Sequence, residues 1–149
     1  MEKVIKKFSE LTAQELHDLL KLRQDVFIIE QNCIYSDIDG SDPKAIHVLL
    51  YEGNSLVAYS RLFAPNIKFD GASAIGRIIV SPAFRGSKFG RLLIETSISL
   101  CNELYPNAEI RIEAQAKLET YYQKYGFKSV SEVYEVDAIP HLQMSIFPN

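Results

Sequence analysis

The sequence predicts a mixed α+β fold, in which helices flank a sheet, and three features carry this prediction. Residues 45–51 and 56–63 are apolar runs joined by a short turn, which is typical of an antiparallel hairpin. Residues 74–81 form another apolar run, followed by a glycine-containing loop and an amphipathic segment. Residues 108–114 and 116–125 repeat the change from strand to helix before the chain returns to strand patterns. The chain is therefore expected to contain more strands than helices, with the helices lying between strands in the sequence.

The N-terminal part predicts one strand and one helical region. Residues 4–8 read as a short strand. Thr12 and Glu15, three residues apart, fit a capping box that opens a helix. Four apolar side chains then fall close to one helical face, at Leu16, Leu19, Leu20 and Phe27. We expect a bent helix or a helical hairpin between the first strand and the second.

Turn residues mark the ends of the later elements. Gly53 and Asn54 tolerate the positive φ that a tight hairpin turn needs. The helix after the glycine loop is expected to run to about Leu104, because Pro106 follows it. Gly126 occupies the position of a C-terminal glycine cap for the helix at residues 116–125.

Two more strands are expected to close the chain. Residues 127–134 and 141–147 carry the strand patterns, and Pro140 falls in the loop that we expect between them.

Length and composition favour a single compact domain over residues 1–149. The chain is 47% hydrophobic and 23% charged, and its formal net charge is -3. This charge argues against a general electrostatic grip on nucleic acid. No apolar run approaches the roughly 18 residues of a membrane span. With two cysteines, Cys33 and Cys101, and no pattern of a secretory signal, we expect a cytoplasmic, reduced protein.

The loop RGSKFG, from Arg85 to Gly90, joins the predicted strand to the predicted helix. The first turn of a helix leaves N–H groups unpaired, and with the helix dipole they attract phosphate. Glycines allow close approach of the backbone, and Arg85, Lys88 and Arg91 add charge. The alternative is an ordinary strand-to-helix turn. Neither the P-loop pattern nor the GxGxxG dinucleotide pattern is present.

The segments IIVSPAFRGSKFGRLLIE and AQAKLETYYQKYGF resemble the two signature regions of the GNAT superfamily of acyl-CoA-dependent N-acyltransferases. The segments EQNCIYSDIDGSD and IPHLQM extend the resemblance, within that superfamily, to the ElaA subgroup of small bacterial proteins. The resemblance implies a mostly antiparallel mixed sheet, flanked by helices, whose central strands splay apart. It also implies that acetyl-CoA is the cosubstrate and that no metal is needed.

The resemblance also assigns residues to the cosubstrate. Lys88 stands where the family's loop usually has its middle glycine, which puts one backbone contact in doubt. By position, the pantetheine arm lies along Ile78, Ile79 and Val80. The pyrophosphate lies at Arg85, Gly86, Ser87, Lys88, Phe89, Gly90 and Arg91.

Acetyl transfer to an amine requires a base for the amine proton and an acid for the leaving thiolate. The resemblance places the acid at Tyr122, whose alternative role is core packing. The base is open among Glu113 at a strand end, Glu30 at the end of the first helical region, and His47. His141 is equally ambiguous, because a lone histidine is more often structural.

The loop SDIDGSD gathers Asp37, Asp39 and Asp42. Its spacing does not match a calcium loop. These carboxylates either attract a cationic amine or, as we favour, bond their own backbone in an ordinary turn. Direct transfer needs no acyl-enzyme, so Cys33 and Cys101 are expected to be structural.

Three functions follow from these observations. The first is an acetyl-CoA-dependent N-acetyltransferase that acts on a primary amine of a small molecule or peptide, without nucleic acid or membrane partners. The second is a non-catalytic acyl-CoA-binding or interaction domain on the same scaffold. The third, a nucleotide-phosphate enzyme, is disfavoured because its motifs are missing. The oligomeric state stays open, with a homodimer as one option.

Overall fold

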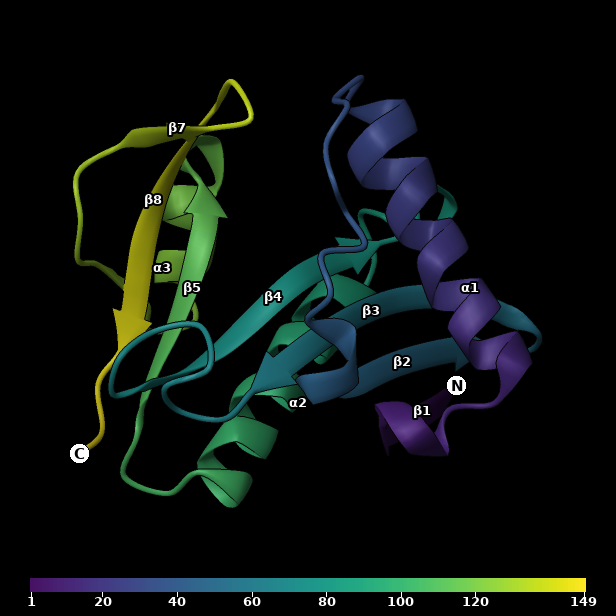
Figure 1. Ribbon diagram of the computed structural model, residues 1–149, viewed down its shortest axis with the longest axis horizontal. Coiled ribbons are helices and arrows are strands. Elements are labelled where there is room, and N and C mark those ends of the chain that lie inside the picture. Colours follow the sequence, from purple (N-terminus) through teal and green to yellow (C-terminus); the bar gives the residue numbers. More distant parts are fainter.

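A computed structural model describes residues 1–149, and its centre is a twisted, mostly antiparallel sheet of eight strands (Figure 1). The strand order is β1-β2-β3-β4-β5-β8-β6, with β7 paired to β8. The strands are β1 (Glu2–Lys7), β2 (Ile46–Glu52), β3 (Ser55–Phe63), β4 (Ala72–Val80), β5 (Glu109–Gln115), β6 (Lys128–Ser129), β7 (Tyr134–Val136) and β8 (Ile139–Ile146). The mixed α+β class with flanking helices is confirmed.

The first helical region is one bent run made of α1 (Ala13–Arg23) and the π-helical turn η2 (Gln24–Glu30). The predicted capping box is present. The Thr12 hydroxyl accepts from the Glu15 N–H at 3.1 Å, and the Glu15 carboxylate accepts from the Thr12 N–H at 2.9 Å. The wider π-helical winding of η2 carries the chain toward the end of β4.

The hairpin of β2 and β3 turns through Gly53 and Asn54, as predicted. Of these two residues only Gly53 takes a positive φ, +61°. A positive φ at the first central position alone is the pattern of a type II′ turn, so Asn54 does not use its tolerance of that region.

The helix α2 (Phe89–Leu104) connects β4 to β5, and these two strands are the sheet's parallel pair. Their pairing covers only three residue pairs, from Ala72↔Glu109 to Ala74↔Arg111. Beyond Ala74 the strands diverge, which confirms the splayed centre that the family resemblance implied.

The C-terminal strands differ from the prediction in two ways. Residues 127–134 do not form one strand, because β6 and β7 pair with different parts of β8. Pro140 lies inside β8, where we expected a loop. It pairs with Glu135 of β7, beyond the last β5 pair, so its missing N–H costs no bond to β5. The turn uses Asp137 and Ala138, both at positive φ.

Helices cover both faces of the sheet (Figure 1). The helix α1 with η2 covers one face, through a cluster around Leu19, Leu49 and Tyr59. The opposite face carries α2 and the short α3 (Glu119–Gln123), which follows the 3-10 turn η5 (Ala116–Leu118). Three further 3-10 turns lie in the connections, η1 (Phe8–Glu10), η3 (Asp42–Lys44) and η4 (Pro82–Phe84). None of the helices has the length and apolar character needed to cross a membrane.

Candidate functional site

The divergence of β4 and β5 leaves a cavity of about 820 Å³ between them. Its wall includes the end of β4, from Ile75 to Val80, whose edge toward β5 has no strand partner. On the other side it includes residues 112–115 of β5. A cavity of this volume lies in the range of small-molecule sites. Unpaired strand edges offer N–H and C=O groups to a ligand that runs alongside.

The two faces of the sheet divide the cavity wall. Ile112 and Ala114 pack on the side of α2 and α3. Side chains alternate along a strand, so Glu113 and Gln115 point to the opposite face. There the Gln115 side-chain amide donates to the side-chain Oε1 of Gln31, just beyond η2, at 3.3 Å. A ligand can therefore be contacted in this cavity from both sides of the sheet.

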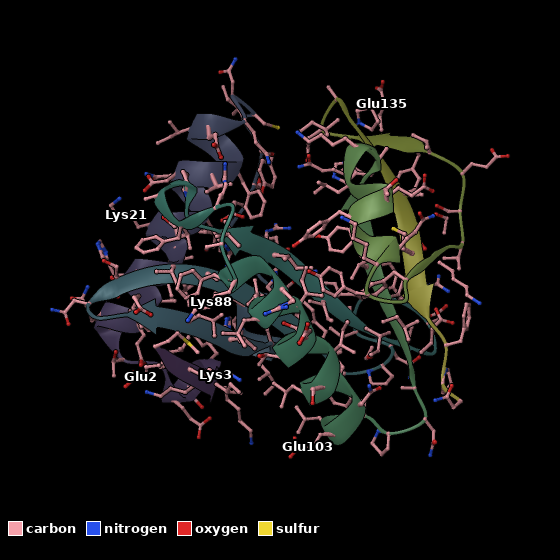
Figure 2. The ribbon with its side chains drawn as sticks, turned by 180° about the vertical axis from the view of Figure 1, so that it is seen from behind. Glu2, Lys3, Lys21, Lys88, Glu103 and Glu135 are labelled. Carbon is pink, nitrogen blue, oxygen red and sulfur yellow. The ribbon has the colours of Figure 1, made fainter.

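The predicted phosphate loop leads directly into the first turn of α2. Gly86 has φ +75°, a conformation that favours glycine. Lys88 has φ −68° and ψ −14°, so a side chain is tolerated at this position without backbone strain. Figure 2 shows Lys88 at the start of α2, on the face of the molecule opposite α1. Lys88 stands where the family's loop usually has a glycine, and its backbone angles are ones that any residue adopts. The lysine therefore adds a side chain without requiring a strained backbone in the loop.

Gly90 is needed for space. A Cβ atom built on it would lie 3.0 Å from the Tyr121 hydroxyl oxygen and 3.7 Å from the Val80 side chain. Phe89, by contrast, is buried and packs edge-on against Phe84. Ser87 donates its hydroxyl to the Phe84 carbonyl, which tightens the loop. Of the loop's side chains, only that of Phe89 is therefore buried, and the Ser87 hydroxyl is tied back to the loop's own backbone.

Arg85 and Glu30 meet at the edge of the cavity. The guanidinium donates to both carboxylate oxygens at 2.7 Å, and its Nε donates to the Val80 carbonyl at 3.1 Å. The Arg85 bond lowers the pKa of Glu30, and the same bond raises the pKa of Arg85. Both groups are thus charged and occupied by each other.

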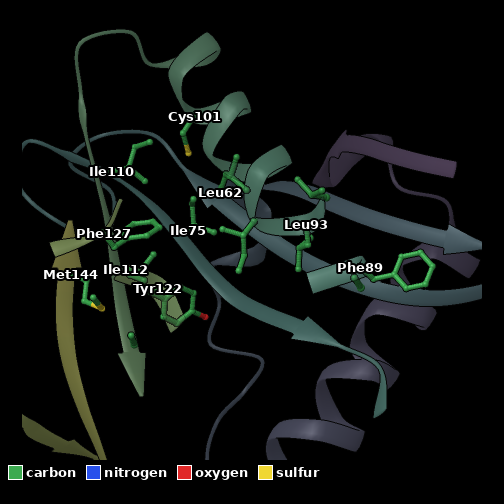
Figure 3. Packing of buried hydrophobic residues seen from close by; sticks show 14 of the residues in the cluster. Leu62, Ile75, Phe89, Leu93, Cys101, Ile110, Ile112, Tyr122, Phe127 and Met144 are labelled. Atoms are coloured by element: carbon green, nitrogen blue, oxygen red, sulfur yellow. The ribbon is translucent and has the colours of Figure 1, made fainter. Parts of the chain in front are cut away.

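Tyr122 lies on α3 with its ring in the core and its hydroxyl at the cavity. The ring packs edge-on against Tyr121 and Phe127, and only 6% of the residue is exposed. Figure 3 shows the hydroxyl pointing away from Ile112 and Met144, into the space between β5 and β4. Burial raises the pKa of Tyr122, so this hydroxyl keeps its proton at neutral pH.

Glu113 lies on the opposite face of the sheet and lines the same cavity. Its carboxylate accepts a hydrogen bond of 2.6 Å from the Tyr134 hydroxyl of β7. Burial, together with this bond, raises the pKa of Tyr134 to about 12. One carboxylate oxygen of Glu113 is therefore already engaged.

His47 lies apart from these groups, on β2, and does not line the cavity. It is fully buried. Its Nε2 donates to the Asp42 carbonyl at 2.9 Å, and its Nδ1 accepts from the Tyr59 hydroxyl at 2.7 Å. Burial lowers its pKa, so the ring is neutral with both nitrogens satisfied.

The aspartates of the loop SDIDGSD form ion pairs with arginines, a role that the sequence analysis did not predict. Asp42 accepts from Arg23 at 2.7 Å and from Arg61 at 2.9 Å, with all three nearly or fully buried. Asp37 accepts from the Nε of Arg23 and of Arg77, and Asp39 accepts from Arg61. The Asp39 bond to the Ser41 N–H is the one backbone contact of the kind expected for a turn. The two buried arginines, Arg23 and Arg61, lie in segments whose sequence contains no motif that would predict a buried ion pair.

The structure thus brings most of the predicted site residues to one place. Seven of them line the cavity: Glu30, Ile78, Ile79, Val80, Arg85, Glu113 and Tyr122. Gly86, Ser87, Lys88, Phe89, Gly90 and Arg91 form the adjoining loop and first helical turn. The remaining one, His47, lies elsewhere. Several polar lining residues had no sequence signal of their own, among them Gln31, Arg77, Gln115, Lys117 and Asp137.

Known proteins share both the sequence and the architecture. The chain matches the acetyltransferase (GNAT) domain family over residues 9–147. It is 42% identical over 139 residues to protein ElaA of Escherichia coli, with 92% of this chain and 90% of that protein covered. The crystal structure of Escherichia coli ElaA is similar with a TM-score of 0.91 and 40% identity, covering 98% of this chain and 99% of that one. An acyl-CoA N-acyltransferase from Pseudomonas aeruginosa gives a TM-score of 0.91 and 37% identity, with coverage of 98% and 99%.

Proposed function

The chain belongs to the GNAT acetyltransferase family, and on this basis we propose that it transfers the acetyl group of acetyl-CoA directly to a primary amine, with residues 1–149 acting as one domain. The observation that carries the proposal is the cavity between β4 and β5, which is lined from both faces of the sheet. Direct transfer requires the thioester and the amine to meet in one enclosed place, so that attack is effectively intramolecular.

The residues present fit a coenzyme A thioester. The open edge of β4 supplies backbone groups for the amides of a pantetheine arm along Ile78, Ile79 and Val80. The first turn of α2, at the end of the loop, offers unpaired N–H groups. Bound acetyl-CoA would supply the activated acyl group; the chain would orient it and keep water away.

Charge near the loop supports the same assignment. Arg85, Lys88, Arg91 and Lys117 lie on the loop, on α2 and on η5, near one end of the cavity. Arg85 is bound to Glu30, so we propose that it contacts the pyrophosphate by exchanging or sharing that partner.

We assign the general acid to one face of the sheet and the approach of the acceptor amine to the other. We assign to Tyr122, on the α3 side, the donation of its hydroxyl proton to the departing thiolate. A neutral phenol that lines the cavity suits this task. The opposite face, with Glu113 and Gln115, is then the side from which the amine approaches.

The test is a measurement of CoA release. Purified protein is incubated with acetyl-CoA and a panel of amines, and free thiol is followed over time. Binding of acetyl-CoA is measured separately by calorimetry. Amine-dependent thiol release, together with acetylated amine detected by mass spectrometry, supports the proposal. Binding without turnover across the panel would instead favour the non-catalytic acyl-CoA-binding domain.

A further inference from the structure

His141 lies on β8 at the rim of the proposed acceptor side. Its direct cross-strand neighbours are Gln115 of β5 and Tyr134 of β7. Residues opposite each other on paired strands share a face of the sheet. His141 therefore shares the face of Gln115 and Glu113, and it lines the same cavity as Tyr122.

A single hydrogen bond determines the tautomer of His141. Its Nδ1 lies 2.7 Å from the carbonyl oxygen of Ile139. A carbonyl oxygen only accepts, so Nδ1 carries the proton. In the neutral ring Nε2 then carries the lone pair, and it has no hydrogen-bond partner within the chain. The imidazole is thus oriented by the backbone with its basic nitrogen left available.

The other candidates for the base are wholly or partly engaged, Glu113 through one of its two carboxylate oxygens. Glu30 is held by Arg85 through both oxygens, and Glu113 accepts from Tyr134. Both nitrogens of His47 are bonded away from the cavity. Resting on the function proposed above, we propose that Nε2 of His141 is the base that removes the proton from the acceptor amine.

The proton balance is complete with groups already named. An ammonium acceptor gives one proton to Nε2 of His141, which passes it to solvent. The nitrogen lone pair then forms the C–N bond to the acetyl carbon. As the C–S bond breaks, Tyr122 gives its proton to the sulfur. The nitrogen loses its second proton to Nε2, and water carries this proton back to the Tyr122 oxygen.

The first experiment replaces His141 with asparagine. The Asn side-chain amide keeps a donor near the Ile139 carbonyl but offers no basic nitrogen. We expect turnover to fall by about 10² to 10⁴-fold, the usual contribution of a positioned base. Acetyl-CoA affinity and melting temperature should stay near those of the wild type. The matched control is His17→Asn, because His17 is an exposed residue of α1 outside the cavity and its change should leave turnover intact.

Two further measurements separate a base from a structural residue. In His141→Ala, added imidazole should restore part of the turnover by occupying the vacated space. In the wild type, ¹⁵N NMR of the imidazole should show a protonated Nδ1 and a bare Nε2 for His141. The chain has only three histidines, and the spectrum of the Asn variant identifies the signal.

The outcomes distinguish the assignment of the base to His141 from the proposed acetyltransferase function on which it rests. If the wild type acetylates amines and His141→Asn is equally fast, the assignment to His141 is wrong and the proposed function stands. If the wild type binds acetyl-CoA but acetylates no amine, the proposed function fails and the assignment fails with it. A proton found on Nε2 of His141 at neutral pH would overturn the assignment whatever the turnover.

Discussion

Arg85 and Glu30, 55 residues apart in the sequence, bind each other through two hydrogen bonds of 2.7 Å. The sequence had placed these residues in different roles, one at the pyrophosphate and one as a base. The pair links the end of η2 to the loop before α2. Under the proposed function, Arg85 would exchange or share this partner to contact the pyrophosphate, and Glu30 would have to lose Arg85 before it could accept a proton.

Neutralising the loop charges should weaken acetyl-CoA binding. In the double variant Arg85→Gln and Lys88→Gln, we expect a loss of about 1 to 3 kcal/mol and a flatter dependence of affinity on salt. Calorimetry at two salt concentrations measures both. The matched control removes two lysines outside the loop, Lys3 and Lys44, and should leave the affinity unchanged. Glu30→Gln should not weaken binding, because it removes a competitor for Arg85. An affinity loss that is independent of salt would indicate that the loop charges act through packing.

Filling the space at Gly90 should block the cosubstrate. We expect Gly90→Val to reduce acetyl-CoA affinity at least about tenfold, or 1.4 kcal/mol, while the protein stays folded. The added side chain also crowds the Tyr121 hydroxyl. Combining it with Tyr121→Phe relieves that contact, and affinity should remain low. Recovery of affinity in the double variant would mean that Tyr121, and not the ligand, is what the side chain disturbs.

Tyr122→Phe tests the acid. Since the hydroxyl has no bonding partner in the chain and the ring remains in the core, the free energy of unfolding should change by less than about 1 kcal/mol. Turnover should fall, with acetyl-CoA affinity nearly unchanged. Tyr121→Phe serves as the control on the neighbouring ring. Full activity in the Tyr122 variant would leave water as the proton source.

The buried ion pairs should matter far more to stability than exposed ones. Burial alone would raise the pKa of Asp42, but its bonds to Arg23 and Arg61 outweigh burial and lower it. Asp42→Asn leaves two buried guanidinium groups short of a counter-charge, so we expect a loss of about 3 to 5 kcal/mol in urea unfolding. Asp25→Asn breaks an exposed pair with Lys21 and should cost no more than about 0.5 kcal/mol. Equal losses in the two variants would contradict this account.

His47 should make the free energy of unfolding depend on pH in the mildly acidic range. Burial lowers its pKa below the usual 6.5, so below about pH 6.5 the unfolded chain takes up a proton that the folded chain refuses. The free energy of unfolding should therefore fall as pH drops from 7 to 5, by up to about 1.4 kcal/mol per pH unit from this group. His47→Gln should flatten that slope, and His17→Gln should not. Urea midpoints at pH 7, 6 and 5 measure it; an unchanged slope in the His47 variant would show that other groups cause the effect.

Local signals predicted local structure well. The capping box at Thr12, the turn at Gly53 and the helix end near Leu104 depend on neighbouring residues, and all three are present. Gly126 has a positive φ, but α3 ends at Gln123 and Lys124 is its C-cap, so the glycine stands two residues beyond the C-cap and not in the cap position predicted for it. The prediction of a single strand over residues 127–134 was wrong. The bounds of β6 and β7 are set by their pairing with β8, and strand propensity does not report such pairing.

The partners of charged side chains escaped the sequence for a related reason. Asp37 and Arg77 lie 40 residues apart and meet only because the loop after η2 folds over β4. The same holds for the Arg85 and Glu30 pair. Residue type indicated that His47 and His141 were chemically interesting, but only the bonds at their nitrogens show which of them has a lone pair to offer.

An exposed strand edge in the middle of a sheet normally invites another polypeptide to pair with it and start aggregation. The free edge of β4 lies inside the molecule, along the cavity that β4 and β5 leave between them. Two contacts join residues of the cavity wall across from one another, the Gln31–Gln115 side-chain bond and, at 3.7 Å, the contact of the Cys33 thiol with the Asp137 carbonyl. A strand of another molecule would have to pass these contacts to reach the β4 edge, which shields the edge from intermolecular pairing. The same gap that exposes backbone groups within the sheet is thus kept by the surrounding loops from becoming a site of aggregation.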